Sequence, residues 1–291
     1  MKAVMTLLVR DEADIIRQNI LFHLERGIDH IIAMDNGSLD GTRDLLCDFV
    51  RAGVLTLIDE PEQNYAQSQW VTRMALMARD QYSADWVLSN DADEFWVPSA
   101  SSLKEDLKEA DADALICERY NMVFGFDAED SSPWTERLVY RVRTPVPRPI
   151  LNDLLQDPLP CPYFYLALPS KVIVRTARLK AIAQGNHNAA FDGKSRKENA
   201  SIRIRHFPIR SRKQFELKVM QGGAAYARNA EAPPTWGWHW RRWFRMLSHG
   251  ELERALSDAL PSAARLREDI AAGIVVRDPE VATFLTRPSG P

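Results

Sequence analysis

Short apolar runs recur through the first hundred residues of the chain. Residues 2–9 are apolar almost throughout, as expected for a strand that is buried on both faces of a sheet. Their length of a few residues, and the polar or turn-forming residues that bound them, favour strands over buried helices. The predicted strands cover residues 2–9, 30–34, 54–58 and 86–89.

Helical patterns fill the spaces between these runs. We expect Asp11 and Glu12 to open the first helix, because carboxylates oppose the positive end of the helix dipole, and Gly27 to follow its C-terminus. Further helices are expected over 42–50 and 66–80. Strands joined by single helices predict right-handed crossovers, so the fold class is α/β: an open, mostly parallel twisted sheet with helices on both faces.

The pattern becomes less regular after about residue 125. Seven prolines between residues 144 and 169 exclude regular helix there, and we interpret this segment as a long excursion over the active-site edge that acts as a lid. Strand character returns at 171–175 and 202–207. Helices are expected over 213–228 and 251–271.

Composition and charge exclude several classes of protein. The chain has 291 residues with 37 basic and 40 acidic side chains, a balance that argues against a nucleic-acid-coating protein. The three cysteines are scattered without a C-x-x-C pair, which favours reduced thiols over a disulfide framework or a zinc site. The N-terminal apolar run is shorter than the roughly 18 residues that a membrane span needs, so we expect a cytoplasmic protein.

Carboxylates follow each of the four predicted strands. Ligands of open α/β sheets bind at the carboxyl ends of the strands, where these groups would repel one another unless a cation or a donor-rich ligand lay among them. Asp91 and Asp93 have the spacing to bind Mg²⁺ or Mn²⁺ together with a diphosphate. A solvated acidic turn is the alternative. The strand-end carboxylates are Asp11, Glu12, Asp35, Asp59, Glu60, Asp91 and Asp93.

The turn from Asp35 to Thr42 is a second candidate site. Asp35 can accept a hydrogen bond from the imide N–H of a uracil-like base, and Gly37 and Gly41 permit close backbone approach. The alternative is an Asx turn with no ligand. The chain contains neither G-x-G-x-x-G nor G-x-x-x-x-G-K-[ST], which argues against dinucleotide oxidoreductases and P-loop nucleotidases.

These motifs carry a family resemblance. The segments 8–14, 35–42 and 91–95, with Gly185-Asn186-His187 and the 206–211 element, resemble bacterial family 2-type glycosyltransferases, in the subgroup near family 92. The resemblance covers roughly residues 1–230 and implies a GT-A-like fold, a nucleotide-diphosphate sugar as donor, and a divalent metal. It implies a glycosyltransferase domain over 1–230, with a nucleotide-binding half (1–100) and an acceptor half (101–230), before a Trp-rich and helical C-terminal extension over 231–291.

The resemblance also implies roles for individual residues. By that match Arg10, Glu12 and Asp35 line the nucleotide pocket, and Asp91 and Asp93 hold the metal and diphosphate. His206 matches a late histidine that serves as a further metal ligand, although a structural histidine is the alternative. Asn36 departs from the family, where many members have a second aspartate, and this leaves the ribose contacts open.

The reaction that the resemblance implies is a displacement at the anomeric carbon with inversion. A carboxylate or histidine must take the proton of the acceptor hydroxyl, and the leaving diphosphate needs positive charge. Arg73 and the basic residues between 194 and 218 are candidates for that charge; a solvated basic face is the alternative, as is an anionic polymer partner. The candidate bases are Glu136 and Asp192, with Glu94 as a further option and with ordinary surface salt bridges as the alternative. His187, in a loop of small polar residues, is a further candidate for the catalytic site, as a ligand, an acceptor contact or a turn residue.

Four tryptophans occur within residues 236–243. Core or oligomer packing, acceptor binding and contact with the inner membrane face all suit such a segment. The predicted partners are a nucleotide sugar and a glycan or lipid-linked acceptor, in surface glycan or polysaccharide synthesis. Three other functions remain open: a nucleotidyltransferase, a non-catalytic glycan- or nucleotide-binding module, and a metal-dependent phosphohydrolase.

Overall fold

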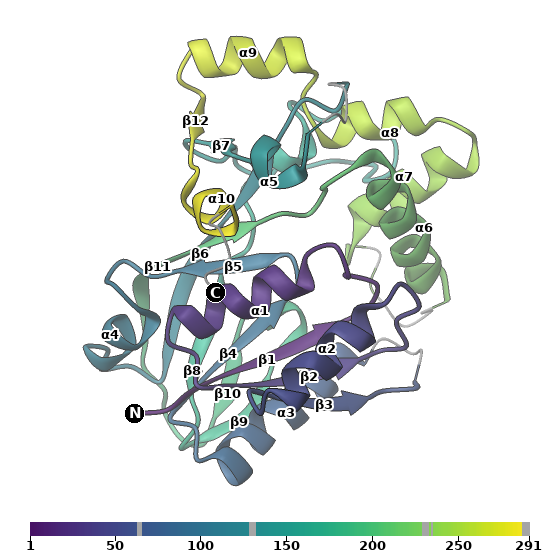
Figure 1. Ribbon diagram of the computed structural model, residues 1–291. Coiled ribbons are helices and arrows are strands. Elements are labelled where there is room, and N and C mark those ends of the chain that lie inside the picture. Colours follow the sequence, from purple (N-terminus) through teal and green to yellow (C-terminus); the bar gives the residue numbers. More distant parts are fainter. Residues whose placement is uncertain (63–65, 128–131, 229–232, 234, 287–291) are drawn as a thin grey trace. The chain divides into compact units, whose positions relative to one another are not determined.

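The computed structural model describes residues 1–62, 66–127, 132–228, 233 and 235–286 (Figure 1). The chain divides into two compact units. Unit 1 comprises residues 1–119 and 169–206, and unit 2 comprises residues 120–168 and 207–291. The predicted boundary between 230 and 231 lies outside the described residues.

Unit 1 is built on a mixed sheet with the strand order β6-β8-β4-β1-β2-β3. The strands β4, β1, β2 and β3 are parallel, while β8 pairs antiparallel with β4, and β5 pairs antiparallel with β11. The predicted α/β class is confirmed, and its parallel part is the half that carries the candidate residues. The elements are β1 (Ala3–Val9), α1 (Ile16–Glu25), β2 (His30–Asp35), α2 (Thr42–Arg51), β3 (Leu55–Asp59), α3 (Gln67–Tyr82), β4 (Trp86–Asp91), β5 (Glu94–Val97), α4 (Leu103–Lys108), β6 (Ala114–Val123, which continues into unit 2), β8 (Lys171–Arg175), β9 (Leu179–Ile182), η2 (Gln184–Asn186), β10 (Ala189–Phe191) and β11 (Lys197–His206).

The parallel register brings the acidic strand ends to one edge of the sheet. Val9 at the end of β1 lies opposite Asp35, and Asp35 lies opposite Asp59. On the other side of β1, Leu8 lies opposite Asp91. The edge predicted from the apolar runs is therefore present.

Helices cover both faces of this sheet, as predicted. Helix α3 packs on one face, where Met74 joins a buried cluster with Val4 and Ile32. Met5 and Leu7 alternate with Val4 along β1, so they point to the other face of the sheet, and they are also fully buried. Helix α1 lies over the sheet in Figure 1. Burial on both faces explains why these strands are apolar at successive positions, since each buried aliphatic side chain contributes about 1.5–3 kcal/mol.

Two predicted helices were wrong in their bounds. Helix α1 begins at Ile16 and not at Asp11, because Asp11 has a positive φ of 52° and its amide donates to Ser38 Oγ at 3.0 Å. The predicted helix 251–271 is two helices, α8 (Leu252–Ala259) and α9 (Ala263–Ala271), because Pro261 interrupts the helix. The second helix is capped by Ser262, whose hydroxyl accepts from the amide of Arg265.

Unit 2 contains short strands and a group of helices. Helices α6 and α7 pack so closely that a Cβ on Gly223 would come within 2.3 Å of Phe244 Cβ. None of the described helices in either unit is long and apolar enough to cross a membrane. The elements are the end of β6, α5 (Trp134–Arg137), β7 (Tyr140–Val142), η1 (Tyr163–Tyr165), α6 (Arg212–Arg228), α7 (Trp238–Ser248), α8 (Leu252–Ala259), α9 (Ala263–Ala271), β12 (Val275–Arg277) and α10 (Glu280–Leu285).

The Trp-rich segment forms part of the core of unit 2. Trp243 is fully buried, and its ring lies 5.2 Å from that of Tyr163 in the proline-rich segment. Arg242 is also buried; its guanidinium binds the carboxylate of Asp258 through two hydrogen bonds and donates to the carbonyl of Asp157 at 2.8 Å. Of the interpretations that the sequence left open, core packing accounts for Trp243, and the proline-rich segment is tied to α7 within unit 2.

Candidate active site

The acidic motif occupies a tight turn between two strands. Strand β4 ends at Asp91 and β5 begins at Glu94, so Ala92 and Asp93 form the turn. Asn19 on α1 holds this turn: its Nδ2 donates to the carbonyl of Ala92 at 2.9 Å and to that of Glu94 at 2.7 Å. The turn is therefore fixed by a buried side chain and is not a solvated loop.

A network of buried hydrogen bonds holds the side chain of Asn19 in place. Asn90 Nδ2 donates to Asn19 Oδ1, and Trp96 Nε1 donates to Asn90 Oδ1. The amide of Trp96 donates to His23 Nε2 at 3.2 Å, while His23 Nδ1 donates to the carbonyl of Asn19. Burial lowers the pKa of His23 to about 4, against the opposing effects of its bond to Asn19 and the charge of Glu94. The imidazole is therefore neutral at pH 7, which suits a nitrogen that accepts a backbone N–H.

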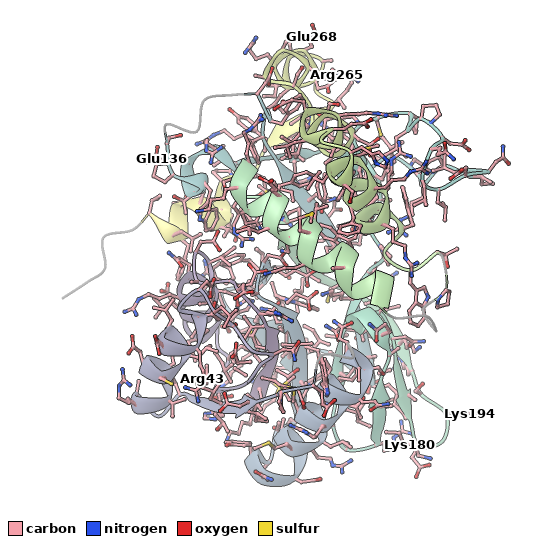
Figure 2. All side chains as sticks on the ribbon, turned by 90° about the vertical axis from the view of Figure 1, so that its right-hand side faces the viewer. Arg43, Glu136, Lys180, Lys194, Arg265 and Glu268 are labelled. Carbon is pink, nitrogen blue, oxygen red and sulfur yellow. The ribbon has the colours of Figure 1, made fainter. Side chains whose placement is uncertain are left out.

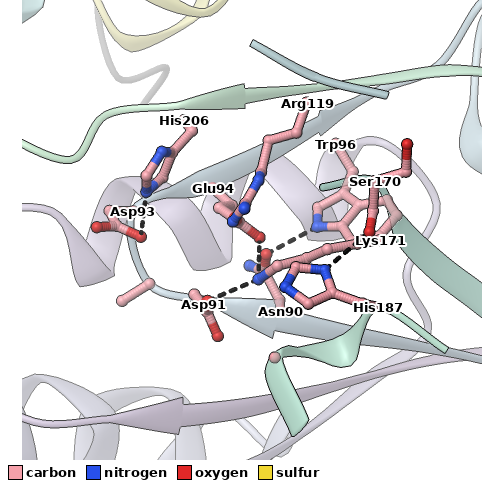
Figure 3. A network of polar contacts seen from close by, with 12 residues as sticks. Asn90, Asp91, Asp93, Glu94, Trp96, Arg119, Ser170, Lys171, His187 and His206 are labelled. Carbon is pink, nitrogen blue, oxygen red and sulfur yellow. Dashed lines mark hydrogen bonds and ion pairs between the residues drawn. The ribbon is translucent and has the colours of Figure 1, made fainter. Parts of the chain in front are cut away.

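Asp93 and His206 approach each other at the edge of this turn. Strand β11 runs antiparallel to β5, with His206 opposite Glu94, and His206 Nε2 lies 3.6 Å from Asp93 Oδ1 (Figure 3). A carboxylate oxygen and an imidazole nitrogen are both ligands of Mn²⁺-type ions, and Mg²⁺ and Mn²⁺ sites at phosphates use few protein ligands beside substrate and water. Among the described residues there is no group of three or more potential ligands. Asp93 and His206 offer one carboxylate and one imidazole as potential metal ligands, and any further ligands would come from substrate and water.

Asp91 is bound to a lysine that we did not predict as a site residue. Lys171 Nζ lies 2.6 Å from Asp91 Oδ2 and 2.6 Å from Glu94 Oε2 (Figure 3). The side chain of Lys171 is 1% exposed and that of Glu94 is 0% exposed, while 36% of the Asp91 side chain remains exposed. Arg119 binds the other oxygen of Glu94, at 2.7 Å. Burial opposes ionisation of Glu94, but Lys171 and Arg119 outweigh it and hold its pKa below the usual value.

The sequence around Lys171 does contain a signal for this contact. Lys171 heads the apolar run Val172-Ile173-Val174, and a charged residue at the end of a buried strand needs a partner. Because β8 runs antiparallel to β4, its first residue lies at the carboxyl end of β4. The antiparallel pairing was not predictable from the apolar pattern alone, so the partner was not recognised.

His187 lies near this ion-pair network. Its Nδ1 is 2.8 Å from the carbonyl of Ser170, next to Lys171 in the chain (Figure 3). A carbonyl only accepts, so Nδ1 carries the proton and Nε2 keeps its lone pair. The side chain of His187 is exposed at the surface, and its partial desolvation, followed by the charge of Arg119, lowers its pKa. The ring packs over Gly185, where a Cβ would come within 2.7 Å of Nε2.

The predicted nucleotide loops are tied to each other by hydrogen bonds. Both carboxylate oxygens of Asp35 accept from Ser38, three residues further along the chain, one from its amide and one from its hydroxyl. The amide of Glu12 donates to Thr42 Oγ1 at 2.9 Å. Gly37, between Asp35 and Ser38, has a positive φ of 77°, a conformation that glycine adopts without strain. Glu12 and Asp35 are buried in these loops.

Several strand-end carboxylates have their own cationic partners. Arg43 binds Asp59 through two hydrogen bonds, at 2.8 and 2.9 Å (Figure 2). Arg73 lies 3.6 Å from Glu60. Arg10 lies 3.7 Å from Asp11, with more than a third of its side chain exposed. The repulsion expected at this edge is therefore partly relieved by the protein itself.

One predicted base, Asp192, does not lie at the Asp91–Asp93 turn. Asp192 is exposed and pairs with Lys180 at 2.8 Å (Figure 2). Its amide donates to the carbonyl of Arg178, beyond the end of β8 that pairs with the start of β4, so Asp192 lies at the opposite edge of the sheet. Glu136 belongs to unit 2, where it is exposed on α5 (Figure 2).

Several residues of the predicted basic segment have acidic or carbonyl partners of their own. Arg196 pairs with Asp111 at 2.6 Å and Arg203 with Glu118 at 3.3 Å, both in unit 1. Arg212 pairs with Glu253 in unit 2, and the buried Arg210 donates to the carbonyl of Phe207. These side chains serve separate structural contacts.

Comparison with solved structures finds distant similarity to the S. aureus protein TarS. One TarS structure is 11% identical, with 89% of this chain matched to 44% of that chain and a TM-score of 0.40. The chain thus spans under half the length of that relative. A structure of TarS 1–349 in complex with UDP is 12% identical, with 98% of this chain matched to 90% of that chain and a TM-score of 0.35. No curated protein matches the sequence.

Comparison with protein families gives a match over most of the chain. The family described as glycosyltransferase family 92 matches residues 4–240. This range begins in β1 and ends in α7, and it contains the Asp91–Asp93 turn, Lys171, His187 and His206. The chain therefore belongs to glycosyltransferase family 92.

Proposed function

We propose that this enzyme moves a sugar from a nucleotide-diphosphate donor, with a UDP-sugar favoured, to a hydroxyl group of a glycan or lipid-linked acceptor, with inversion at the anomeric carbon. The process in which we place it is surface glycan or polysaccharide synthesis. The observation that carries the proposal is the Asp93–His206 pair beside Asp91, at the carboxyl end of β4. Open α/β sheets bind their ligands at this edge.

Mn²⁺ or Mg²⁺ fits this site. Asp93 and His206 would hold the ion, with the exposed part of Asp91 facing the same edge. When bound, such an ion neutralises negative charge on the leaving diphosphate. The buried hydrogen-bond network from Asn19 to Trp96 fixes the turn before substrate arrives, which reduces the reorganisation that binding requires.

His187 is the group that we propose to take the acceptor proton. The acceptor hydroxyl transfers its proton to Nε2, its oxygen forms the new bond to the anomeric carbon, and the bond from that carbon to the diphosphate breaks, with the electron pair leaving on the diphosphate oxygen. A single displacement of this kind inverts the anomeric centre. His187 is favoured over Asp192 because it lies at Lys171 while Asp192 lies at the opposite edge of the sheet. Its lowered pKa keeps Nε2 unprotonated at pH 7.

The proposal is tested by nucleotide binding to the purified protein. Thermal unfolding is measured with UDP, GDP, dTDP and CDP, each with and without Mn²⁺, for the wild type, for Asp93→Ala, and for Asp80→Ala as a control on the exposed surface of α3. A ligand at about 100 times its dissociation constant stabilises the fold by about 2.7 kcal/mol. We expect UDP to stabilise the wild type more than the other nucleotides do, and only when Mn²⁺ is present. Asp93→Ala should abolish this stabilisation, and Asp80→Ala should retain it. Equal stabilisation of all three proteins, or none by any nucleotide, would contradict the proposal.

A further inference from the structure

We propose that the Lys171 ammonium occupies a second cation position beside the Asp93–His206 pair, so that the site takes one divalent ion where its carboxylates alone would hold two. Lys171 is in this sense a positioning residue for Asp91. The inference rests on the proposed function only for the ion at Asp93 and His206.

The position of the Lys171 nitrogen resembles that of a bound metal. It lies 2.6 Å from an oxygen of Asp91, at the end of β4, and 2.6 Å from an oxygen of Glu94, at the start of β5. Two carboxylates from either side of one turn thus converge on one point. The distances are those at which carboxylate oxygens surround Ca²⁺. An ammonium at this point leaves no room for an ion bound between the same two oxygens.

Burial makes the lysine a permanent part of the site. Lys171 is 1% exposed and Glu94 0% exposed, so the contact between them is not a surface ion pair screened by solvent. Arg119 takes the remaining oxygen of Glu94 at 2.7 Å, which withholds Glu94 from any ion at the Asp93 side of the turn. Asp91 differs, because its exposed part remains available to a ligand.

The charges at the Lys171 position fit this inference. Asp91 and Glu94 converge on the Lys171 ammonium, and Arg119 pairs with the other oxygen of Glu94. Without Lys171, the two carboxylates would face the space that its ammonium had filled, which favours a divalent ion between them.

The test removes the ammonium and counts bound ions. Mn²⁺ is titrated into the full-length protein without nucleotide, and free Mn²⁺ is measured by electron paramagnetic resonance for the wild type, Lys171→Ala and the double variant Lys171→Ala/Glu94→Gln. We expect the wild type to bind one ion. Lys171→Ala should bind a second ion at least about tenfold more tightly than the wild type does, and a tenfold difference in affinity corresponds to about 1.4 kcal/mol. The double variant should lose that second ion, because one of its two carboxylates is neutral.

The outcomes separate this inference from the proposed function. Asp93→Ala alone should abolish binding of the first ion. When it is combined with Lys171→Ala, binding of the second ion should remain. If the wild type binds no Mn²⁺ and Lys171→Ala binds one through Glu94, the role of Lys171 stands and the metal-dependent reaction fails. Lys171→Gln, which keeps two N–H donors for the carboxylates but removes the positive charge, is titrated in parallel. This variant should also bind a second ion. Folded Lys171 variants with the ion count and affinity of the wild type would overturn the inference, since a purely structural lysine would change stability alone.

Discussion

Asn90 donates a hydrogen bond from its Nδ2 to Asn19 Oδ1 at 2.9 Å, and this bond joins the end of strand β4 to helix α1. Because the other end of the Asn19 amide donates to the carbonyls of Ala92 and Glu94, one side chain positions both sides of the turn that holds Asp93. Nothing in this contact involves substrate. The geometry of the acidic turn is thus set by the core of unit 1.

Replacing Asn19 should therefore affect both stability and ligand binding. Asn19→Ala removes the side-chain donor of two carbonyls, those of Ala92 and Glu94, and the acceptor of the Asn90 amide, and each group left unsatisfied costs about 1–3 kcal/mol. We expect a loss in this range in urea unfolding, together with weaker Mn²⁺-dependent nucleotide binding below the unfolding transition. Leu21→Ala, on the exposed side of the same helix, is the control and should change neither quantity appreciably. Wild-type nucleotide affinity in folded Asn19→Ala would contradict the role given to Asn19.

The stability of the protein should fall on acidification through His23. Its pKa is about 4 in the folded protein and 6.5 in an unfolded chain, so between these values the unfolded state binds more protons. The contribution is present above pH 6.5 and is lost as the pH falls toward 4. Between pH 7.5 and 5 this amounts to about 2 kcal/mol.

Urea unfolding at the two pH values measures this loss. In His23→Gln the part of the decrease that His23 causes should disappear, although the variant is less stable at both pH values. His249→Gln, which changes an exposed histidine after α7, should keep the wild-type difference. An unchanged pH dependence in His23→Gln would show that the histidine is not the titrating group.

The parallel half of the fold was predictable because local pattern determined it. Continuous apolar runs such as residues 2–9 are typical of strands buried on both faces, and the acidic residues after them had to share an edge of the sheet. The antiparallel part was not predictable in this way. Strand β5 begins only three residues after Asp91, and β8 joins β4 from more than eighty residues away, so neither pairing leaves a local periodicity.

The candidate site shows the same division. Asp91 and Asp93 were recognisable by their spacing, and His206 lies 3.6 Å from Asp93, while its role as a metal ligand stays a prediction. Lys171 and Arg119 were missed because they act by contacts across strands. The start of α1 was misplaced because Asp11 and Glu12, which suit a helix N-terminus by charge, instead bind the loop after β2.

The close packing of α6 on α7 yields a prediction with a built-in control. A Cβ at Gly223 would lie 2.3 Å from Phe244 Cβ, far inside van der Waals contact, whereas a Cβ at Gly222 would meet Trp240 at an ordinary 3.7 Å. Gly223→Ala should therefore destabilise the protein by about 1–3 kcal/mol, as overpacking does. Gly222→Ala should stabilise it by up to about 1 kcal/mol, because alanine favours helix over glycine. Thermal unfolding of the two variants checks the pair, and equal effects would contradict this close packing.

The assignment of His187 as the base predicts a change in the pH profile of sugar transfer. With Nδ1 bound to the Ser170 carbonyl, only Nε2 can take a proton, and protonation of Nε2 abolishes the base. Because partial desolvation and Arg119 lower its pKa, the active form is present at pH 7 and is lost as the pH falls below the usual histidine range.

In His187→Gln, kcat should fall by about 10²–10⁴ while KM changes little, and the acidic limb of the profile should vanish. Initial rates of nucleoside diphosphate release between pH 5 and 8 measure this, with His249→Gln as a matched histidine control. If His187→Gln keeps the wild-type kcat and Glu136→Gln loses it, His187 is not the base. The carboxylate of Glu136, in unit 2, would then be the group that accepts the proton of the acceptor hydroxyl.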